Sequence, residues 1–150
     1  MTDLNPHADP GSDPAAEWRV PAPTDNVNHP AHYNSDRFGI ECIAIGRHLI
    51  GTAFNAWKYT FRHAEKNGAE DLRKALVYLD WAAEDRVPAI LDGHRVAAWT
   101  LYDQHIAPRL DAVDPVYRAL GFILASDWSA ARNSIRTRLD ELAAAAVVTQ

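Results

Sequence analysis

The strongest chemical pattern in the sequence is a set of polar side chains at helical spacing: Asn55, Lys58, Tyr59, Arg62 and Lys66. At about 100° of rotation per residue, they fall within an arc of about 100° on one side of a helix. Cationic groups on one face can neutralise phosphate charge, and phenol or amide groups beside them can stack on or hydrogen-bond to the rest of a ligand. The pattern predicts a site for a phosphorylated small molecule.

A second polar set follows on the next predicted helix. Asp71, Lys74 and Tyr78 recur at steps of three and four, and the turn at Asn67 and Gly68 is short. Short turns favour antiparallel neighbours, so this set is expected to face the first across a groove. The alternative is an ordinary solvated surface. Amide and phenol groups within the stripes argue against it, because an indifferent helix surface more often carries Glu, Lys or Ala.

The elements that must position these residues are helices. Apolar residues at steps of three and four share the helix of the first polar set: Ile50, Phe54, Trp57, Phe61 and Ala64. Periodicity and stop signals predict helices over residues 40–50, 52–66, 69–85 and 93–105, with further helices from about residue 115 and after residue 126. The expected fold class is all-α, a compact helical domain of five to six helices.

The predicted organisation is one helical domain after a tail. Residues 1–26 are rich in proline and poor in large apolar residues, which predicts disorder. Residues 27–150 form the domain, with the motifs in 27–85 and additional helices in 86–150. The last helix carries an apolar stripe of Trp128, Ala131, Ile135, Leu139, Leu142 and Ala146. That stripe packs either on the core or on a second subunit, so a homo-oligomer is one of the expectations.

Composition limits the function classes. The chain has 150 residues, 47% hydrophobic and 23% charged, as is typical of a soluble globular protein. A formal charge of −5 and a pI near 5.7 argue against binding to polymeric nucleic acid. No run of residues is long and apolar enough to cross a membrane, and a single cysteine excludes an internal disulfide. These features favour a cytoplasmic protein.

The loop before the first helix holds His29, His32 and Tyr33. Pro30 forces the preceding residue toward extended backbone, so residues 28–33 are predicted to form a rigid loop. The histidines could bind a metal with Glu41 or Cys42, hydrogen-bond to phosphate or base, or cap the following helix. Two histidines at one spacing are a weak metal signal, and no metal site is predicted. Residues 46–52 imitate a phosphate-binding loop but lack its lysine and its preceding strand.

The histidine loop and the two polar helix faces together resemble a family of small bacteriophage proteins that was long of unknown function. One branch of that family is described as deoxynucleoside monophosphate kinases without a P-loop. The resemblance covers about residues 27–80 and rests on residues 28–33, 39–43, 55–59, 62, 66–68, 70–75, 78 and 79. It implies a nucleotide ligand, with a phosphate donor such as ATP. It leaves open whether magnesium takes part.

The roles expected for these residues follow the chemistry of phosphoryl transfer, which needs positioning and charge stabilisation. The candidate catalytic residues are His29, His32, Lys58, Arg62 and Asp71. The cations would neutralise phosphate, and the histidines or Asp71 would handle protons or orient the cations. The candidate nucleotide-binding residues are Tyr33, Asn55, Tyr59, Lys66, Lys74 and Tyr78.

The sequence also departs from that family's pattern. Ala44 stands where family members commonly have Asp, and Ala64 and Glu65 stand where a glycine and a basic residue are common. If the missing Asp binds metal or acts as a base, the chain has kept binding and lost turnover. The first alternative function is therefore a non-catalytic protein that sequesters a nucleotide, for example against a host defence. The second is a helical protein-interaction module that docks through the last helix.

Overall fold

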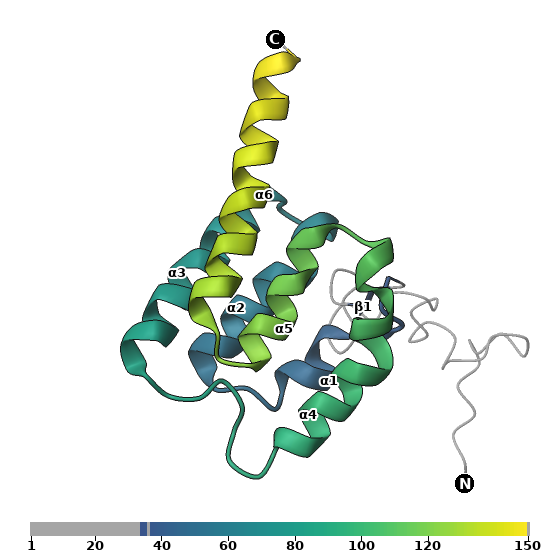
Figure 1. The fold of residues 1–150 in the computed structure, drawn as a ribbon, viewed down its shortest axis with the longest axis vertical. Coiled ribbons are helices and arrows are strands. Elements are labelled where there is room, and N and C mark those ends of the chain that lie inside the picture. The colour runs from purple at the N-terminus through teal and green to yellow at the C-terminus, as the bar shows by residue number, and fades with distance from the viewer. Residues whose placement is uncertain (1–33, 36, 150) are drawn as a thin grey trace, which may run out of the picture.

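The computed structural model describes residues 34, 35 and 37–149, and this part is almost entirely helical (Figure 1). The all-α prediction is confirmed. The predicted tail and the loop with His29, His32 and Tyr33 lie outside the described residues. The elements are β1 (Asn34–Ser35), β2 (Ile40–Glu41), α1 (Cys42–Gly46), α2 (Gly51–Arg62), η3 (His63–Glu65), α3 (Ala69–Asp85), α4 (Arg95–Leu101), η4 (Tyr102–Ile106), η5 (Ala107–Ala112), η6 (Pro115–Tyr117), α5 (Arg118–Leu124) and α6 (Trp128–Val148).

The first predicted helix is much shorter than residues 40–50. Its start is lost because β2 pairs with β1 as a small antiparallel hairpin. Its end is lost because the chain makes only tight turn bonds as far as Leu49 and then hydrogen-bonds to a distant loop. The Ile50 N–H donates to the Ala89 carbonyl at 2.8 Å, and the Leu91 N–H donates to the His48 carbonyl at 2.8 Å. These long-range bonds satisfy the backbone without helix and fix where α2 begins.

The second predicted helix ends one turn earlier than expected. α2 ends at Arg62, and the chain continues as the 3₁₀ turn η3. Gly68, with a φ of +57°, then precedes the first residue of α3. Ala64, expected in the core, is therefore exposed. The early end also removes Lys66 from the helical face, because the 100° periodicity no longer applies after Arg62.

One hydrophobic core joins the motif-bearing helices to the C-terminal ones. Trp57 and Phe61 of α2 are fully buried, and the Phe38 ring lies 5.7 Å from Phe61 and edge-on to Tyr117 at 5.2 Å. Ile135 of α6 is fully buried in the same core. The apolar stripe of α6 thus packs within the chain at this position, and Ile135 is not available to a partner.

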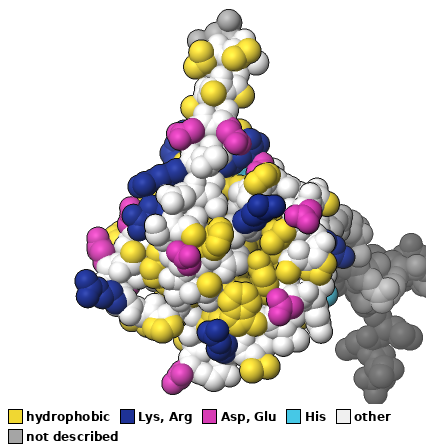
Figure 2. Space-filling view, in the orientation of Figure 1, with side chains coloured by type: hydrophobic (Ala, Val, Ile, Leu, Met, Phe, Trp, Pro, Cys, Tyr) yellow, Lys and Arg dark blue, Asp and Glu magenta, His cyan; other side chains and the backbone are white. Residues whose placement is uncertain are grey.

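α6 packs on α3 and α5 and then projects beyond the body of the molecule (Figure 1). Figure 2 shows both signs of charge on this side, an apolar area in the region of α5, and small apolar side chains on the projecting end of α6. Val147 and Val148 near its tip are 73% and 84% exposed. Among the described residues, no helix combines the length and apolar character needed to cross a membrane.

Candidate functional site

The α2–α3 face is built around a buried ion pair. The Arg62 guanidinium donates from Nε to Oδ2 of Asp71 at 3.1 Å and from Nη2 to Oδ1 at 3.3 Å. Asp71 is fully buried and Arg62 is 7% exposed. Asn67 also donates to Asp71 Oδ1, at 3.4 Å. This bidentate pairing holds the guanidinium in one orientation where the two helices meet.

Cations surround the ring of Tyr59. The ring centroid lies 4.6 Å from Lys58 Nζ, 4.7 Å from the Arg62 guanidinium carbon and 5.6 Å from Lys74 Nζ. These distances are within the range in which an aromatic ring attracts a cation. Tyr59 thus gathers positive groups from both helices into one cluster.

Lys58 is the cation of this cluster that lacks a carboxylate partner among the described residues. Its ammonium donates to the Asn55 side-chain oxygen at 3.1 Å, and Asn55 in turn donates to the Gly51 carbonyl at 2.9 Å. Partial burial, followed by the nearby Arg62 guanidinium, lowers the pKa of Lys58. Both causes disfavour the charged form, so an anion placed beside Lys58 would relieve an unfavourable arrangement.

Tyr78 extends the aromatic surface along α3. Its ring lies 5.8 Å from that of Tyr59 with an interplanar angle of 22°, and Trp81 meets it edge-on at 5.3 Å. Lys74, on the same helix, forms an ion pair with Glu70 at 2.9 Å. That hydrogen bond raises the pKa of Lys74, so this ammonium stays charged at neutral pH.

The structure places most, but not all, of the predicted site residues together. It groups the seven residues that we call the α2–α3 face: Asn55, Lys58, Tyr59, Arg62, Asp71, Lys74 and Tyr78. Lys66 is exposed in the turn after η3 and contributes only the weakest of the charges acting on Lys58. His29, His32 and Tyr33 lie outside the described residues, so their predicted roles stay predictions.

The geometry assigns Asp71 a positioning role. Its carboxylate is fully buried, and its oxygens accept hydrogen bonds from Arg62 and Asn67. A carboxylate so occupied orients the guanidinium and is not placed to take a proton from a ligand. Of the two roles expected for Asp71, only the orientation of a cation fits this geometry.

No metal centre is formed by the described residues, in which no three His, Cys, Asp or Glu side chains cluster. Cys42, considered as a ligand for a metal on the histidine loop, is buried, and burial raises its thiol pKa to about 12. A metal binds the thiolate, so this thiol is poorly prepared for the role.

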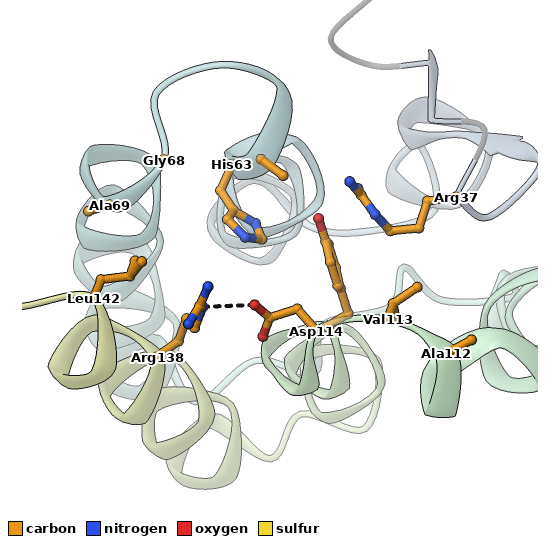
Figure 3. Close-up of a pocket in the computed structure, with 11 residues that line it drawn as sticks. Arg37, His63, Gly68, Ala69, Ala112, Val113, Asp114, Arg138 and Leu142 are labelled. Carbon is orange, nitrogen blue, oxygen red and sulfur yellow. Dashed lines mark ion pairs between the residues drawn. The ribbon is translucent and has the colours of Figure 1, made fainter. Parts of the chain in front are cut away.

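A second cleft was missed by the sequence analysis. It lies between η3 and the C-terminal helices (Figure 3), and its polar residues are Arg37, His63, Asp114, Tyr117 and Arg138. His63 donates from Nδ1 to the Thr60 carbonyl oxygen at 2.7 Å. Because these residues are far apart in the chain, no local spacing could reveal the cleft.

The fold and the α2–α3 face define a small helical protein with a cationic surface lined by tyrosine. Residues 27–80 match the family DUF3310, which is described as being of unknown function. No curated protein and no solved structure matches the chain. The matched segment contains every residue of the α2–α3 face and ends before α4.

Proposed function

We propose that the α2–α3 face binds a nucleotide through its phosphate groups. The observation that carries the proposal is Lys58: a half-buried ammonium that lies beside the Arg62 guanidinium with no carboxylate partner among the described residues. Two cations brought together in this way favour an anion between them. Arg62 stays paired with Asp71, which holds its guanidinium beside Lys58, where its positive charge adds to the attraction for a phosphate.

The rest of the face suits the base and sugar of such a ligand. Tyr59 and Tyr78 form a stacked aromatic surface, on which a base can be added at a gain typical of base–aromatic stacking, about 1–3 kcal/mol. Asn55 offers an amide next to the phosphate-binding lysine. The resemblance of the motifs to nucleoside monophosphate kinases without a P-loop supports a nucleotide as the anion. Such a ligand also agrees with the expected cytoplasmic location.

Two forms of this function make different demands on the face. Phosphoryl transfer needs a group that accepts the proton of the attacking hydroxyl, and usually a magnesium ion. Asp71 of the face is occupied by Arg62, and the adjacent Glu70 is paired with Lys74. Ala44, where the resemblance would place Asp, offers no carboxylate. Transfer would therefore depend on His29 or His32. Binding without turnover needs neither, and the occupied carboxylates favour that second form.

The binding test is calorimetric titration of the full chain with nucleoside mono-, di- and triphosphates at low salt. We expect Lys58→Ala and Lys74→Ala each to weaken binding about tenfold, which corresponds to about 1.4 kcal/mol for one lost charged contact. Lys66→Ala is the matched control, since this lysine lies off the face and its removal should change affinity little. Equal affinity of the wild type and the Lys58→Ala variant would place the ligand elsewhere.

A second experiment separates transfer from sequestration. The protein is incubated with ATP, magnesium and a deoxynucleoside monophosphate, then denatured by heat, and the released nucleotides are identified by chromatography. Unchanged nucleotides, recovered in proportion to the protein present, support binding without turnover. Production of the diphosphate supports transfer, and its loss in Lys58→Ala would assign that activity to the α2–α3 face.

A further inference from the structure

The cleft between η3 and the C-terminal helices is a second binding site candidate, which we call the His63 cleft. Its volume is about 530 Å³, within the range of about 300–1,000 Å³ common for small-molecule sites. Figure 3 shows Arg37 and His63 on one side, opposite Asp114, Arg138 and Leu142. Apolar walls come mainly from Ala64, Ala69, Val113 and Leu142.

The first polar group of the cleft is the hydroxyl of Tyr117. Tyr117 is 1% exposed, and its hydroxyl is buried without a hydrogen-bond partner among the residues that the structure describes. Burial raises the pKa of this phenol, so it stays protonated and can both donate and accept. Buried polar groups in native proteins nearly always have partners, which makes an unpartnered hydroxyl beside a cleft a sign of an absent ligand group.

The second polar group is the imidazole of His63, whose ring centroid lies 5.1 Å from that of Tyr117. Its Nδ1 lies 2.7 Å from the Thr60 carbonyl oxygen. Because a carbonyl only accepts, Nδ1 must carry the proton, and burial lowers the pKa of the ring so that it is neutral. Nε2 is then left as a hydrogen-bond acceptor on a residue that lines the cleft.

The charged groups of the cleft are balanced in pairs. Arg37 Nη1 lies 2.6 Å from Glu65 Oε1. Arg138 Nε lies 2.7 Å from Asp114 Oδ2, the ion pair marked in Figure 3. Each guanidinium already has a carboxylate, so a phosphate or another fully charged ligand would have to separate an ion pair to bind.

We propose that the His63 cleft binds an uncharged nucleobase or nucleoside. A heterocycle of this class has apolar faces for the Ala64 and Val113 walls and a polar edge for the hydroxyl of Tyr117 and Nε2 of His63. The proposal goes beyond nucleotide binding at the α2–α3 face and does not rest on it, because the two sites share no residue and differ in charge balance.

The test is calorimetric titration of the full chain with adenosine, guanosine, cytidine, uridine and thymidine and with the five free bases. We expect at least one of these compounds to bind, and Tyr117→Phe to weaken that binding about tenfold. Ala64→Trp, at an exposed position that lines the cleft, should abolish it by filling the space. The bases and nucleosides are separate arms, so the comparison also shows whether the sugar contributes.

The controls use the neighbouring cleft. Tyr102→Phe removes the hydroxyl of another buried tyrosine, and Ala107→Trp places the same bulk at an exposed alanine; both positions line the cleft against α5. Neither should change nucleoside binding. Thermal unfolding of the apo protein should show Tyr117→Phe to be no less stable than the wild type, because its hydroxyl has no partner to lose.

Two results would overturn the proposal. One is the absence of binding for every base and nucleoside tested. The other is binding that survives both Tyr117→Phe and Ala64→Trp. Nucleoside binding lost in Lys58→Ala but kept in these two variants would move the ligand to the α2–α3 face, which overturns the cleft proposal and leaves nucleotide binding at that face standing.

Discussion

The α2–α3 face and the His63 cleft contain two consecutive residues, one in each, yet differ in how their charges are balanced. Arg62 points to Asp71 in the face, while the next residue, His63, lines the cleft. The face crowds Lys58 against Arg62 without giving Lys58 a carboxylate. The cleft gives a carboxylate to each of its arginines. The pairing of charged side chains within each site, and not the formal charge of −5 on the chain, therefore indicates which ligand each site suits.

The largest effect is expected from removing the carboxylate that orients the face. Asp71→Ala leaves the buried Arg62 charge without this partner and should lower the free energy of unfolding by about 3–5 kcal/mol. Urea denaturation measures the change. Asp80→Ala is the matched control on the same helix, because the Asp80–Arg132 pair is half exposed and should cost about 1 kcal/mol or less. Equal losses in the two variants would contradict a special role for Asp71.

A single substitution should make the cleft resemble the face. Asp114→Asn keeps a side chain that can cap η6 but removes one of the two carboxylates that pair with Arg138 and leaves the more exposed one, Glu141. Nucleoside monophosphates should then bind the cleft about tenfold more tightly, a change of about 1.4 kcal/mol. Calorimetry in the Lys58→Ala background isolates this site. Asp111→Asn, at an exposed aspartate paired with Arg118, serves as control, and an equal gain there would show a general effect of charge.

Lowering the pH should affect the His63 cleft through the protonation of its histidine. The folded-state pKa of His63 is below its ordinary value of 6.5, mainly because the ring is buried, with Asp114, Glu65 and Arg37 as the charges that act on it. Below about pH 6.5 the unfolded chain takes up a proton that the folded chain resists, so stability falls by at most about 1.4 kcal/mol per pH unit from this group. Nucleoside binding at the cleft should weaken in parallel.

The measurement is urea denaturation of wild type and His63→Gln between pH 7.5 and 5.5 (about the window in which imidazole titrates). The difference between the two proteins removes the contribution of the carboxylates common to both. His63→Gln should show a flatter loss of stability toward acid. A pH dependence identical in both proteins would mean that His63 does not titrate as its burial implies.

The smallest effect is expected for the stability of the Lys58 variant. At neutral pH Lys58 is charged in both states, and its lowered folded-state pKa means that folding disfavours that charge. Lys58→Met should therefore leave the free energy of unfolding unchanged or raise it by less than about 1 kcal/mol, because solvent screens a half-exposed group. Thermal unfolding measures this. Lys74→Met, which removes the Glu70 ion pair, should not be stabilising.

Much of the face could be predicted because it depends on helical periodicity. Asn55, Lys58, Tyr59 and Arg62 lie within two turns of one uninterrupted helix, and their spacing fixes their common side. Lys66 was placed wrongly because the sequence between Arg62 and Gly68 gives no sign that α2 tightens into a 3₁₀ turn. The burial of Asp71 was also hidden, since it depends on the packing of α2 against α3.

The cleft could not be predicted because tertiary packing brings its residues together. Residues 37, 63, 114, 117 and 138 come from a loop, a 3₁₀ turn, a helix cap and two helical elements. Similarly, the length of the first helix was overestimated. The hydrogen bonds that end it join Ile50 to Ala89 and His48 to Leu91, and each spans about 40 residues of chain. Local pattern carries no information about such partners.

Above all, we propose that the crowded cations of α2 and α3 bind the phosphates of a nucleotide. The most direct test is a two-dimensional amide NMR titration of the 16.7 kDa chain with a nucleoside monophosphate, in wild type and in Lys58→Ala. We expect saturable shifts along α2 and α3 around Lys58, Arg62 and Lys74, and we expect these shifts to be lost or strongly weakened in the variant. A titration that leaves α2 and α3 unshifted would contradict the claim, whatever happens at the cleft.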